Sequence, residues 1–569
     1  MASFKLGINM AGAISAGAYT AGVLDFLTEA LDAWYDAKAR GEVVPEHDVT
    51  IEVFTGASAG GMCAAISAIL LQQDFEHIQD PGKSGTNNRL FESWVNKIDI
   101  QELLKTTDLA KNSSVISLLD STVIDEIAEY ALAPGDAALV SRPYVSPRLT
   151  LFLSLTNLRG VPYSLNGEAP GSIEETTFFY GDRIRFETVA SSATPLSSKM
   201  AHPINLSVPG AAGGWTLLQQ AAKATGAFPV FLAPRPIMRN QTEYTPPMWE
   251  SINSVLSGTP PPIRPDFPKK LPDWFETLNV DGGVTNNDPF NYAHDYLVSL
   301  APPQPASTSA EGTDRAVLNI APFPTTEEYP VQYDSAKNSN VFLAVSKLFS
   351  ALISQSRFFG ESLDQIMNGT TYSRFVIAPS DDELAKQYAG NPEAQPPALQ
   401  CASLGAFGGF FEKEFRAHDY VLGRRNCQKF LLDHFVLPED NIVIRSGMQE
   451  AHRQEILTRF GRPPLGAYAA SPVVDPNLLK TWIPIIPLCS EDLLKPVLSR
   501  KRTTISDAKL RLIVKMIGKR VRAIVSLWRS QIPSWPLRMF LWPGEWFIPW
   551  LAERPLRNVL ESQLRDSAK

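Results

Sequence analysis

Residues 50–61 read TIEVFTGASAGG, a β-branched run that leads into the small-residue pattern GxSxG. The run predicts a strand over Thr50–Thr55, and the apolar residues that follow predict a helix over Met62–Gln73. In such a strand-to-helix turn the serine hydroxyl is exposed at a helix N-terminus, where the helix dipole and nearby backbone N–H groups favour an oxyanion. Ser58 is therefore a candidate nucleophile, with an ordinary small-residue turn or a phosphate-binding loop as the alternatives.

The same order of strand, loop and helix precedes this turn. Residues 4–10 predict a short buried strand, residues 11–22 are rich in Gly, Ala and Ser, and residues 23–39 predict a helix. Strands that alternate with helices indicate a parallel α/β sheet. Four further strands are expected at Arg148–Leu155, Phe186–Val189, Thr277–Val280 and Ala316–Ala321, and the sheet domain is expected to end near residue 325.

The composition is that of a folded protein, with 569 residues and a formal net charge of −8. The length predicts about two to four domains, and the negative charge argues against a nucleic-acid partner. We find no secretory signal and no apolar stretch of about 20 residues, and the four cysteines show no metal or disulfide spacing. We therefore expect a cytoplasmic protein that is soluble or peripheral on a membrane.

A second block of small residues follows the strand predicted at Thr277–Val280. It reads DGGVTNN from Asp281, and it places a carboxylate at a strand end, where α/β sheets bind their ligands. An α/β-hydrolase would have several strands before its nucleophile and an Asp and a His after it, whereas only 57 residues precede Ser58. Between the two blocks, residues 222–234 read AKATGAFPVFLAP, a small-residue helix ended by prolines.

Taken together, these blocks resemble the patatin-like phospholipase family over roughly residues 4–325. The resemblance implies a three-layer α/β/α domain over residues 1–325 that hydrolyses acyl esters of lipids, as a phospholipase A or a lysophospholipase. It also implies a catalytic dyad of Ser58 and Asp281 without histidine, with Gly56 and Gly60 in the nucleophile elbow. Neither a metal nor an organic cofactor is required.

The first block departs from the family pattern. The family usually has Asp-Gly-Gly-Gly-x-Arg-Gly, whereas residues 9–17 read NMAGAISAG and lack the arginine. Because any residue supplies a backbone N–H, Gly12, Ala13 and Ile14 are expected to line the oxyanion hole. A dinucleotide-binding loop is the rival interpretation, but the glycines are spaced by five, unlike GxGxxG. Asp281 would need a partly buried site that raises its pKa to act as the base for Ser58.

Two regions outside these blocks carry expectations of their own. Residues 234–272 are rich in proline and aromatic residues and predict either a surface linker or a lid. Residues 326–495 are expected to form a mostly helical accessory region. Its densest polar cluster, residues 415–427, is either a solvated helix face or a site where Arg424 or Arg425 binds lipid phosphate or supplies the missing cation. Six histidines lie outside this cluster: His47, His77, His202, His294, His434 and His452. Their spacing is not that of metal ligands, and no metal site is predicted.

The last segment, residues 496–569, is basic and rich in tryptophan. A helical projection of residues 509–529 places the basic side chains in one sector, opposite an apolar sector. The basic sector holds Arg511, Lys515, Lys519, Arg522 and Arg529, and the apolar one Ile513, Ile517, Val521, Ile524 and Trp528. The helix is followed by four tryptophans, Trp535, Trp542, Trp546 and Trp550. A basic amphipathic helix followed by tryptophans is typical of a segment that contacts anionic membrane surfaces. The alternative is that the apolar face packs on the protein.

Two functions of different classes follow from these observations. The first is a serine lipid acyl hydrolase whose substrate is a phospholipid or another acyl-lipid. The second is a catalytically weak patatin-like scaffold that binds lipid or a protein partner. The altered oxyanion loop favours the scaffold, whereas the retained Ser58 and Asp281 favour the enzyme. No sequence feature specifies an oligomeric state.

Overall fold

The computed structural model describes most of the chain. The described residues are 3–134, 139–165, 175–189, 200–208, 210–246, 248–249, 264–300, 310–323, 374–462 and 481–531, with residues 557, 560, 561 and 564.

A nine-stranded mixed sheet forms the centre of the molecule. Seven strands lie in the order β5-β4-β3-β2-β1-β8-β9, while β7 pairs with β3 and β6 pairs with β7. Pairing is parallel from β3 through β2, β1 and β8 to β9, and antiparallel where β4 and β7 meet β3. The strands are β1 (Ser3–Met10), β2 (Asp48–Gly56), β3 (Val145–Leu165), β4 (Glu175–Val189), β5 (His202–Asn205), β6 (Arg235–Asn240), β7 (Trp274–Asp281), β8 (Arg315–Ile320) and β9 (Arg374–Ile377).

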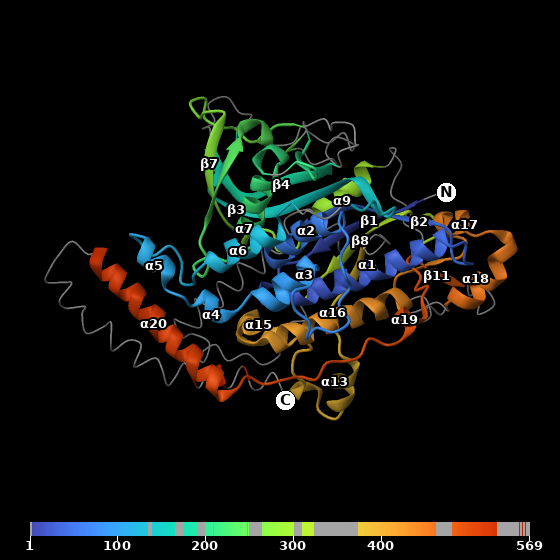
Figure 1. Cartoon of the computed structure of the whole chain (residues 1–569). Helices are drawn as coiled ribbons and strands as arrows, with labels where there is room; N and C mark the ends of the chain where they lie inside the picture. The colour runs from blue at the N-terminus through green and yellow to red at the C-terminus, as the bar shows by residue number, and fades with distance from the viewer. Residues whose placement is uncertain are drawn as a thin grey trace.

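Helices cover both faces of this sheet (Figure 1). On one face lie α1 (Gly17–Ala39), α2 (Ser58–Leu70) and α7 (Trp215–Thr225), and on the other lies α9 (Phe290–Ser299). Strands buried on both faces have near-continuous apolar sequences, as β1 does with Phe4, Leu6 and Ile8. The predicted three-layer α/β/α domain is confirmed.

Shorter elements complete this part of the chain. They are η1 (Ile14–Ala16), α3 (Arg89–Phe91), η2 (Glu92–Lys97), α4 (Ile100–Leu103), α5 (Thr107–Lys111), α6 (Thr122–Ala131), η3 (Ala211–Gly213), η4 (Gln241–Tyr244) and η5 (Gly282–Val284). Helices α1 and α2 begin earlier than the apolar pattern predicts, at Gly17 and Ser58, because small residues continue each helix back to its turn.

The described residues of the C-terminal part, 374–462 and 481–531, are mostly helical. They contain α13 (Asp382–Gln387), η6 (Pro392–Ala394), η7 (Gln400–Ala402), α14 (Ser403–Ala406), α15 (Gly408–Phe411), α16 (Lys413–Asp433), β10 (Val436–Pro438), α17 (Ile442–Ser446), η8 (Glu450–His452), α18 (Arg453–Phe460), β11 (Trp482–Pro484), α19 (Glu491–Leu494) and α20 (Asp507–Gln531).

Helix α16 lies directly against α1 (Figure 1). The helices approach closely at two glycines: a Cβ on Gly22 would lie 1.9 Å from the carbonyl oxygen of Tyr420, and one on Gly423 would lie 2.2 Å from that of Tyr19. Phe415, Tyr420 and most of the polar residues of α16 are buried, some against α1 and others against further segments of the chain. The interpretation of residues 415–427 as a solvated helix face is therefore wrong.

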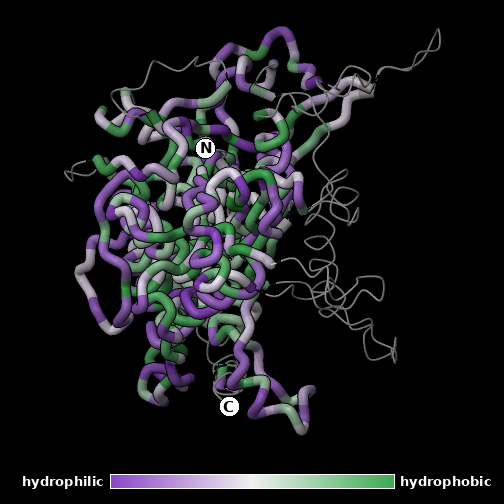
Figure 2. Tube along the Cα trace, turned by 90° about the vertical axis from the view of Figure 1, so that its right-hand side faces the viewer, coloured by the Kyte–Doolittle hydropathy of each residue, from purple (hydrophilic) through white to green (hydrophobic). Residues whose placement is uncertain are grey.

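The sheet does not end near residue 325, because β9 adds a parallel strand beside β8. Buried apolar side chains from both sides of that boundary also belong to one continuous cluster, for example Phe4 with Phe435. In Figure 2 hydrophobic stretches run through the centre of the molecule. The accessory region is thus an integral layer of the fold rather than an appended domain.

Residues 234–272 contain neither a simple linker nor a lid in their described part. Residues 235–240 form β6, and Tyr244 packs with Trp249, Phe267 and Phe275 in a small apolar cluster against the sheet. Residues 250–263 lie outside the described part of the chain.

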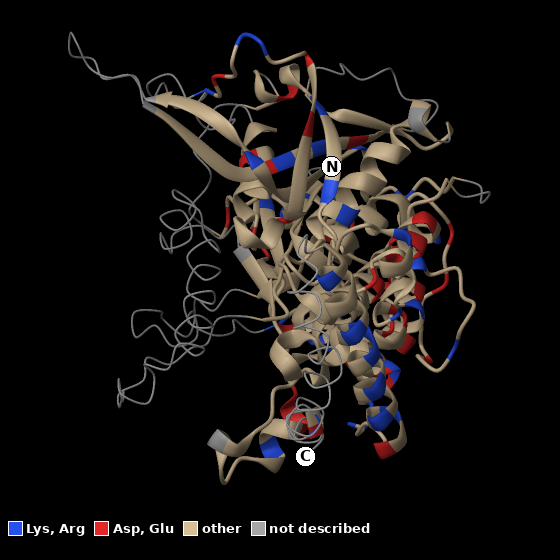
Figure 3. Cartoon of the chain, turned by 90° about the vertical axis from the view of Figure 1, so that its left-hand side faces the viewer, with Lys and Arg blue, Asp and Glu red and all other residues tan. Residues whose placement is uncertain are grey.

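Helix α20 packs on α4 and α5 with its apolar face. Ile513 and Ile524 are buried, and the buried Arg520 forms an ion pair with Asp108. Arg511, Lys515, Lys519 and Arg522 are exposed, and Figure 3 shows basic positions repeating along this helix. The predicted basic and apolar sectors are present, except that Trp528 is 52% exposed and Arg529 is half-buried. The four tryptophans that follow lie outside the described residues.

None of the described helices combines the length and the apolar character needed to cross a lipid bilayer.

Candidate active site

Ser58 stands at the sharp turn between β2 and α2. Its backbone has a φ of 54°, which is unusual for a residue with a side chain and is typical of strained functional turns. The turn presses against the end of β1, since a Cβ on Gly60 would lie 2.1 Å from the carbonyl oxygen of Met10. A Cβ on Gly56 would lie 2.7 Å from the backbone of Gly60. The small residues of the GxSxG pattern are therefore sterically required.

Asp281 ends β7 beside β3 and is 2% exposed. One carboxylate oxygen, Oδ2, accepts a hydrogen bond of 2.6 Å from the Ser58 hydroxyl, and Oδ1 accepts one of 2.7 Å from the Gly283 N–H. Burial raises the pKa of Asp281 to about 7, although the two hydrogen bonds oppose that rise. The carboxyl group is therefore able to exchange a proton with Ser58 near neutral pH.

None of the seven histidines, all of which the structure describes, hydrogen-bonds to Ser58 or Asp281. Most are bound elsewhere: His202 contacts Glu243 at 3.0 Å, His294 contacts Asp295 at 3.3 Å, and His47 contacts the carbonyl of Ile485 at 2.9 Å. Within the described ranges, no group of three or more His, Cys, Asp or Glu side chains is placed to hold a metal ion.

The loop after β1 carries the predicted oxyanion residues, and one of the three is already engaged. The Gly12 N–H donates to the carbonyl oxygen of Asn287 at 3.0 Å, so this N–H points away from a substrate. Ile14 has a φ of 48° and lines the cavity beside Ser58. Ala13 lies between these two residues. The prediction for Gly12 is thus corrected, while Ala13 and Ile14 stay candidates.

Sequence reasoning missed two residues at the turn. Ala59 lines the cavity and belongs to the first turn of α2, where backbone N–H groups have no partner within the helix. Thr225, at the end of α7, accepts the Ser58 N–H at 3.0 Å through its hydroxyl. The position of Ala59 directly after the nucleophile was a usable signal, whereas nothing local marks Thr225.

A buried cluster of hydrogen-bonded polar side chains connects the ends of the strands next to this loop. Asn9 hydrogen-bonds to Asp288, to Asn319 at 2.8 Å and to Thr55 at 2.8 Å, and Asn319 donates to Asp288 at 3.0 Å. The cluster joins β1, β2 and β8 to the residues that follow Asp281. It therefore holds Asn287, which binds the Gly12 N–H, in a defined position.

A cavity of about 50 Å³ opens beside Ser58, and its other lining residues are all apolar or glycine. They come from η1, α2, η2, α4, α6 and the turn after α7, for example Met62, Trp94, Ile124 and Phe228. Phe407 and Phe410, from the C-terminal part of the chain, also line it. Such a surface suits a hydrocarbon chain.

Arg424 and Arg425 do not lie at this cavity. Arg424 is 2% exposed and forms ion pairs with Asp25 and Glu29 of α1, the latter at 2.5 Å. Arg425 contacts Glu383 at 3.2 Å. Since carboxylates of the chain already neutralise both guanidinium groups, the prediction that they bind a lipid phosphate or assist the oxyanion loop is corrected to a structural role.

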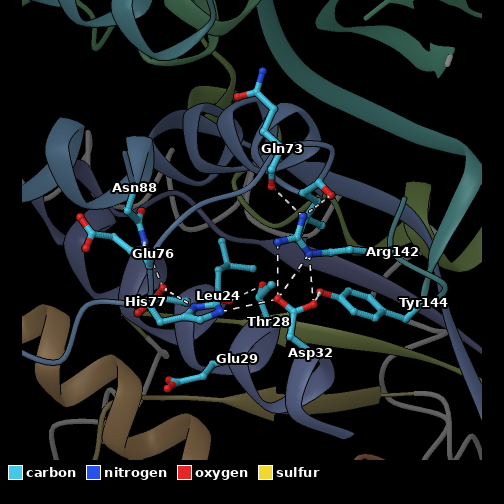
Figure 4. A network of polar contacts seen from close by, with 12 residues as sticks. Leu24, Thr28, Glu29, Asp32, Gln73, Glu76, His77, Asn88, Arg142 and Tyr144 are labelled. Atoms are coloured by element: carbon cyan, nitrogen blue, oxygen red, sulfur yellow. Dashed lines mark hydrogen bonds and ion pairs between the residues drawn. The ribbon is translucent and has the colours of Figure 1, made fainter. Parts of the chain in front are cut away.

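The carboxylates near Arg424 belong to a wider polar network (Figure 4). His77 contacts Asp25 at 3.0 Å and Asp32 at 3.6 Å, and Asp32 also accepts from Tyr144 at 2.6 Å. Burial alone would lower the pKa of His77, but its bonds to Asp25 and Asp32 raise that pKa to about 9. The imidazolium at neutral pH therefore balances buried carboxylates and takes no part in the Ser58 site.

Comparison with known proteins gives two matches. A family profile described as "Patatin-like phospholipase" matches residues 10–294, about half of the chain. The "Uncharacterized protein y4iI" of Sinorhizobium fredii (strain NBRC 101917 / NGR234) is 34% identical over 554 residues, which covers 92% of this chain and 76% of that protein. The similarity to this relative thus extends through the C-terminal part as well.

Proposed function

The chain belongs to the patatin-like phospholipase family, and from that premise we propose that it cleaves fatty-acyl esters of lipids with a Ser58–Asp281 dyad. The family establishes a lipid acyl hydrolase in general terms. The dyad, the acyl-enzyme route and a phospholipase A or lysophospholipase specificity are our proposal.

The observation that carries the proposal is the 2.6 Å hydrogen bond from the Ser58 hydroxyl to a buried carboxylate whose pKa is about 7. An ionised Asp281 takes the proton of Ser58 as the hydroxyl oxygen attacks the acyl carbonyl. It then returns that proton to the leaving alcohol, which leaves an acyl-enzyme. In the second half-reaction Asp281 takes a proton from water as the water oxygen attacks the acyl carbonyl. It then returns this proton to the Ser58 oxygen as the bond between Ser58 and the acyl group breaks, which releases the fatty acid and regenerates both residues.

Backbone groups around Ser58 are suited to the charge that develops on the carbonyl oxygen. Ile14 and Ala59 line the cavity, and Ala13 directly precedes Ile14, so the backbone N–H groups of these three residues are our candidates for the oxyanion hole. The positive end of the α2 dipole lies at Ser58. Backbone donors of this kind replace the arginine that the family loop usually supplies. The apolar cavity would hold the acyl chain.

Hydrolysis of p-nitrophenyl butyrate and release of fatty acid from phospholipid vesicles test this proposal. We expect Ser58→Ala and Asp281→Asn each to lower kcat by about three orders of magnitude or more, since each removes a group required for bond making. The matched control is His202→Ala, which should retain most of the activity. Wild-type protein without Ser58-dependent turnover would favour the alternative, a scaffold that binds lipid or a partner.

A peripheral membrane contact is the second part of the proposal. Arg511, Lys515, Lys519 and Arg522 form an exposed basic face on α20, which we call the α20 basic face. The opposite face is packed on α4 and α5, so the basic side chains of this face are directed outward. Such a face attracts anionic headgroups by about 1 kcal/mol per basic residue.

A further inference from the structure

The cavity beside Ser58 is lined in part by residues from outside the region that matches the family profile. Phe407 and Phe410 line it, although the profile match ends at residue 294. The Phe407 ring meets Phe228 edge-on with 5.6 Å between centroids, and it lies 5.1 Å from Phe231. Phe228 belongs to the turn after α7 and lines the same cavity. Phe407 therefore completes a wall that the sheet domain begins.

A single buried serine ties this region to the oxyanion loop. The Ser15 hydroxyl donates to the carbonyl oxygen of Ala406 at 2.5 Å and accepts the Gly409 N–H at 3.0 Å. Ser15 is fully buried and directly follows Ile14, which also lines the cavity. Because Phe407 lies between Ala406 and Gly409, these two hydrogen bonds fix its position relative to the oxyanion loop.

The backbone that presents Phe407 has an unusual conformation. Leu404, Gly405 and Ala406 have φ values of 54°, 61° and 74°, so three consecutive residues are left-handed. Two of them carry side chains, for which this conformation is strained and persists only where surrounding contacts enforce it.

Those contacts come from the polar cluster of α16. The carboxylate of Asp419 accepts the N–H groups of Gln400 and Cys401, both at 2.8 Å. Arg416 donates to the carbonyl oxygens of Gly409 at 2.6 Å and Val95 at 3.1 Å. Both charged side chains are buried, and so they hold residues 400–411 at both ends against the sheet domain. We call residues 400–411 the closing segment.

We propose that the closing segment is part of the substrate site and that Phe407 determines which acyl chain lengths the enzyme accepts. This inference rests on the proposed hydrolase function. The Phe407 ring lines the apolar cavity and packs on Phe228 and Phe231, so an acyl chain that fills the cavity contacts the ring. Removing the ring enlarges the cavity, and each further methylene that becomes buried in the transition state is worth about fourfold in kcat/KM.

The experiment measures kcat/KM for p-nitrophenyl acetate, butyrate, octanoate and laurate with the full-length protein. We expect Phe407→Ala to raise the ratio of laurate to butyrate kcat/KM at least tenfold, and the bulkier Phe407→Trp to lower it. Phe411→Ala is the matched control, because Phe411 is a buried phenylalanine of the closing segment that does not line the cavity. It should leave the ratio within about twofold of wild type.

The possible outcomes separate this inference from the proposed function. Ser58-dependent turnover by wild type together with an unchanged ratio in both Phe407 variants would overturn the inference and leave the hydrolase intact. A wild type that hydrolyses none of the esters would instead overturn the proposed function. If Phe411→Ala shifted the ratio as much as Phe407→Ala, the shift would result from a loosened closing segment. The proposal that Phe407 determines the accepted acyl chain length would then be refuted.

Discussion

At the level of single residues, the Ser58–Asp281 pair depends on opposing influences on one carboxyl group. Burial raises the pKa of Asp281 to about 7, while hydrogen bonds from Ser58 and Gly283 favour the ionised form. A carboxylate with the usual pKa would be a weak base for a hydroxyl group. In the dyad that we propose, the buried position at the end of β7 makes Asp281 a stronger base than an exposed carboxylate.

This pKa predicts the pH dependence of the reaction. Only the ionised carboxylate accepts the Ser58 proton, so kcat/KM for p-nitrophenyl butyrate should rise with pH, about tenfold per unit below pH 7, and level off above it. Initial rates between about pH 5 and about pH 9 provide the measurement, with circular dichroism as the check that the fold persists. A flat profile over this range would contradict the assignment of Asp281 as the base.

At the level of elements, α16 shows how an internal helix is built from polar residues. Its buried charges each meet a partner: Arg424 meets Asp25, Asp419 meets backbone N–H groups, and Arg416 meets carbonyl oxygens. Burial of unpaired charges would be costly in free energy. The buried charged side chains of α16 are tolerated because α1 and the closing segment supply their partners. The helix thereby connects the ion pairs of α1 to the cavity wall.

Helix α20 gives a prediction of its own. Reversing two exposed charges, with Lys515→Glu and Lys519→Glu, should weaken co-sedimentation with anionic phosphatidylserine vesicles at low salt by roughly tenfold or more. Added salt should weaken wild-type binding in the same way, because it screens the attraction.

The control for α20 is Lys269→Glu with Lys270→Glu, which makes the same charge change on exposed residues before β7. Equal losses for both pairs would indicate a nonspecific charge effect. A folded Lys515/Lys519 variant that binds as well as wild type would refute a membrane role for the α20 basic face.

At the level of the whole molecule, the family-matched part and the C-terminal part share one core. Helix α16 covers α1, β9 covers the edge of β8, and the closing segment completes the cavity. Cutting after residue 325 would therefore expose the apolar face of α1 and an unpaired strand edge, both of which promote aggregation.

We accordingly expect residues 1–325, expressed alone, to lack cooperative unfolding and to show under about 1% of the full-length esterase activity. Urea unfolding followed by tryptophan fluorescence, together with size-exclusion chromatography, measures this. Full-length Ser58→Ala serves as the control for a folded protein without activity. A soluble, active fragment that unfolds cooperatively would show that the C-terminal part is dispensable.

The sequence by itself determined the features that depend on neighbouring residues. The turn at Ser58, the strands beside it and the strand end at Asp281 were predictable, because small residues, β-branched runs and glycines act over a few positions of the chain. The three-layer class followed from the alternation of these local units. Proximity of Ser58 to Asp281 was predicted only through the family resemblance.

Only the tertiary structure decided the features that depend on distant partners. It paired Arg424 with Asp25, engaged the Gly12 N–H with Asn287, added β9 to the sheet and brought Phe407 to the cavity. The polar pattern of α16 is the same whether its charges face water or a partner, and helical periodicity cannot distinguish these cases. The physical reason is that burial and charge pairing are properties of the packed molecule, set by groups far apart in the chain, such as Arg520 and Asp108, which are 412 residues apart.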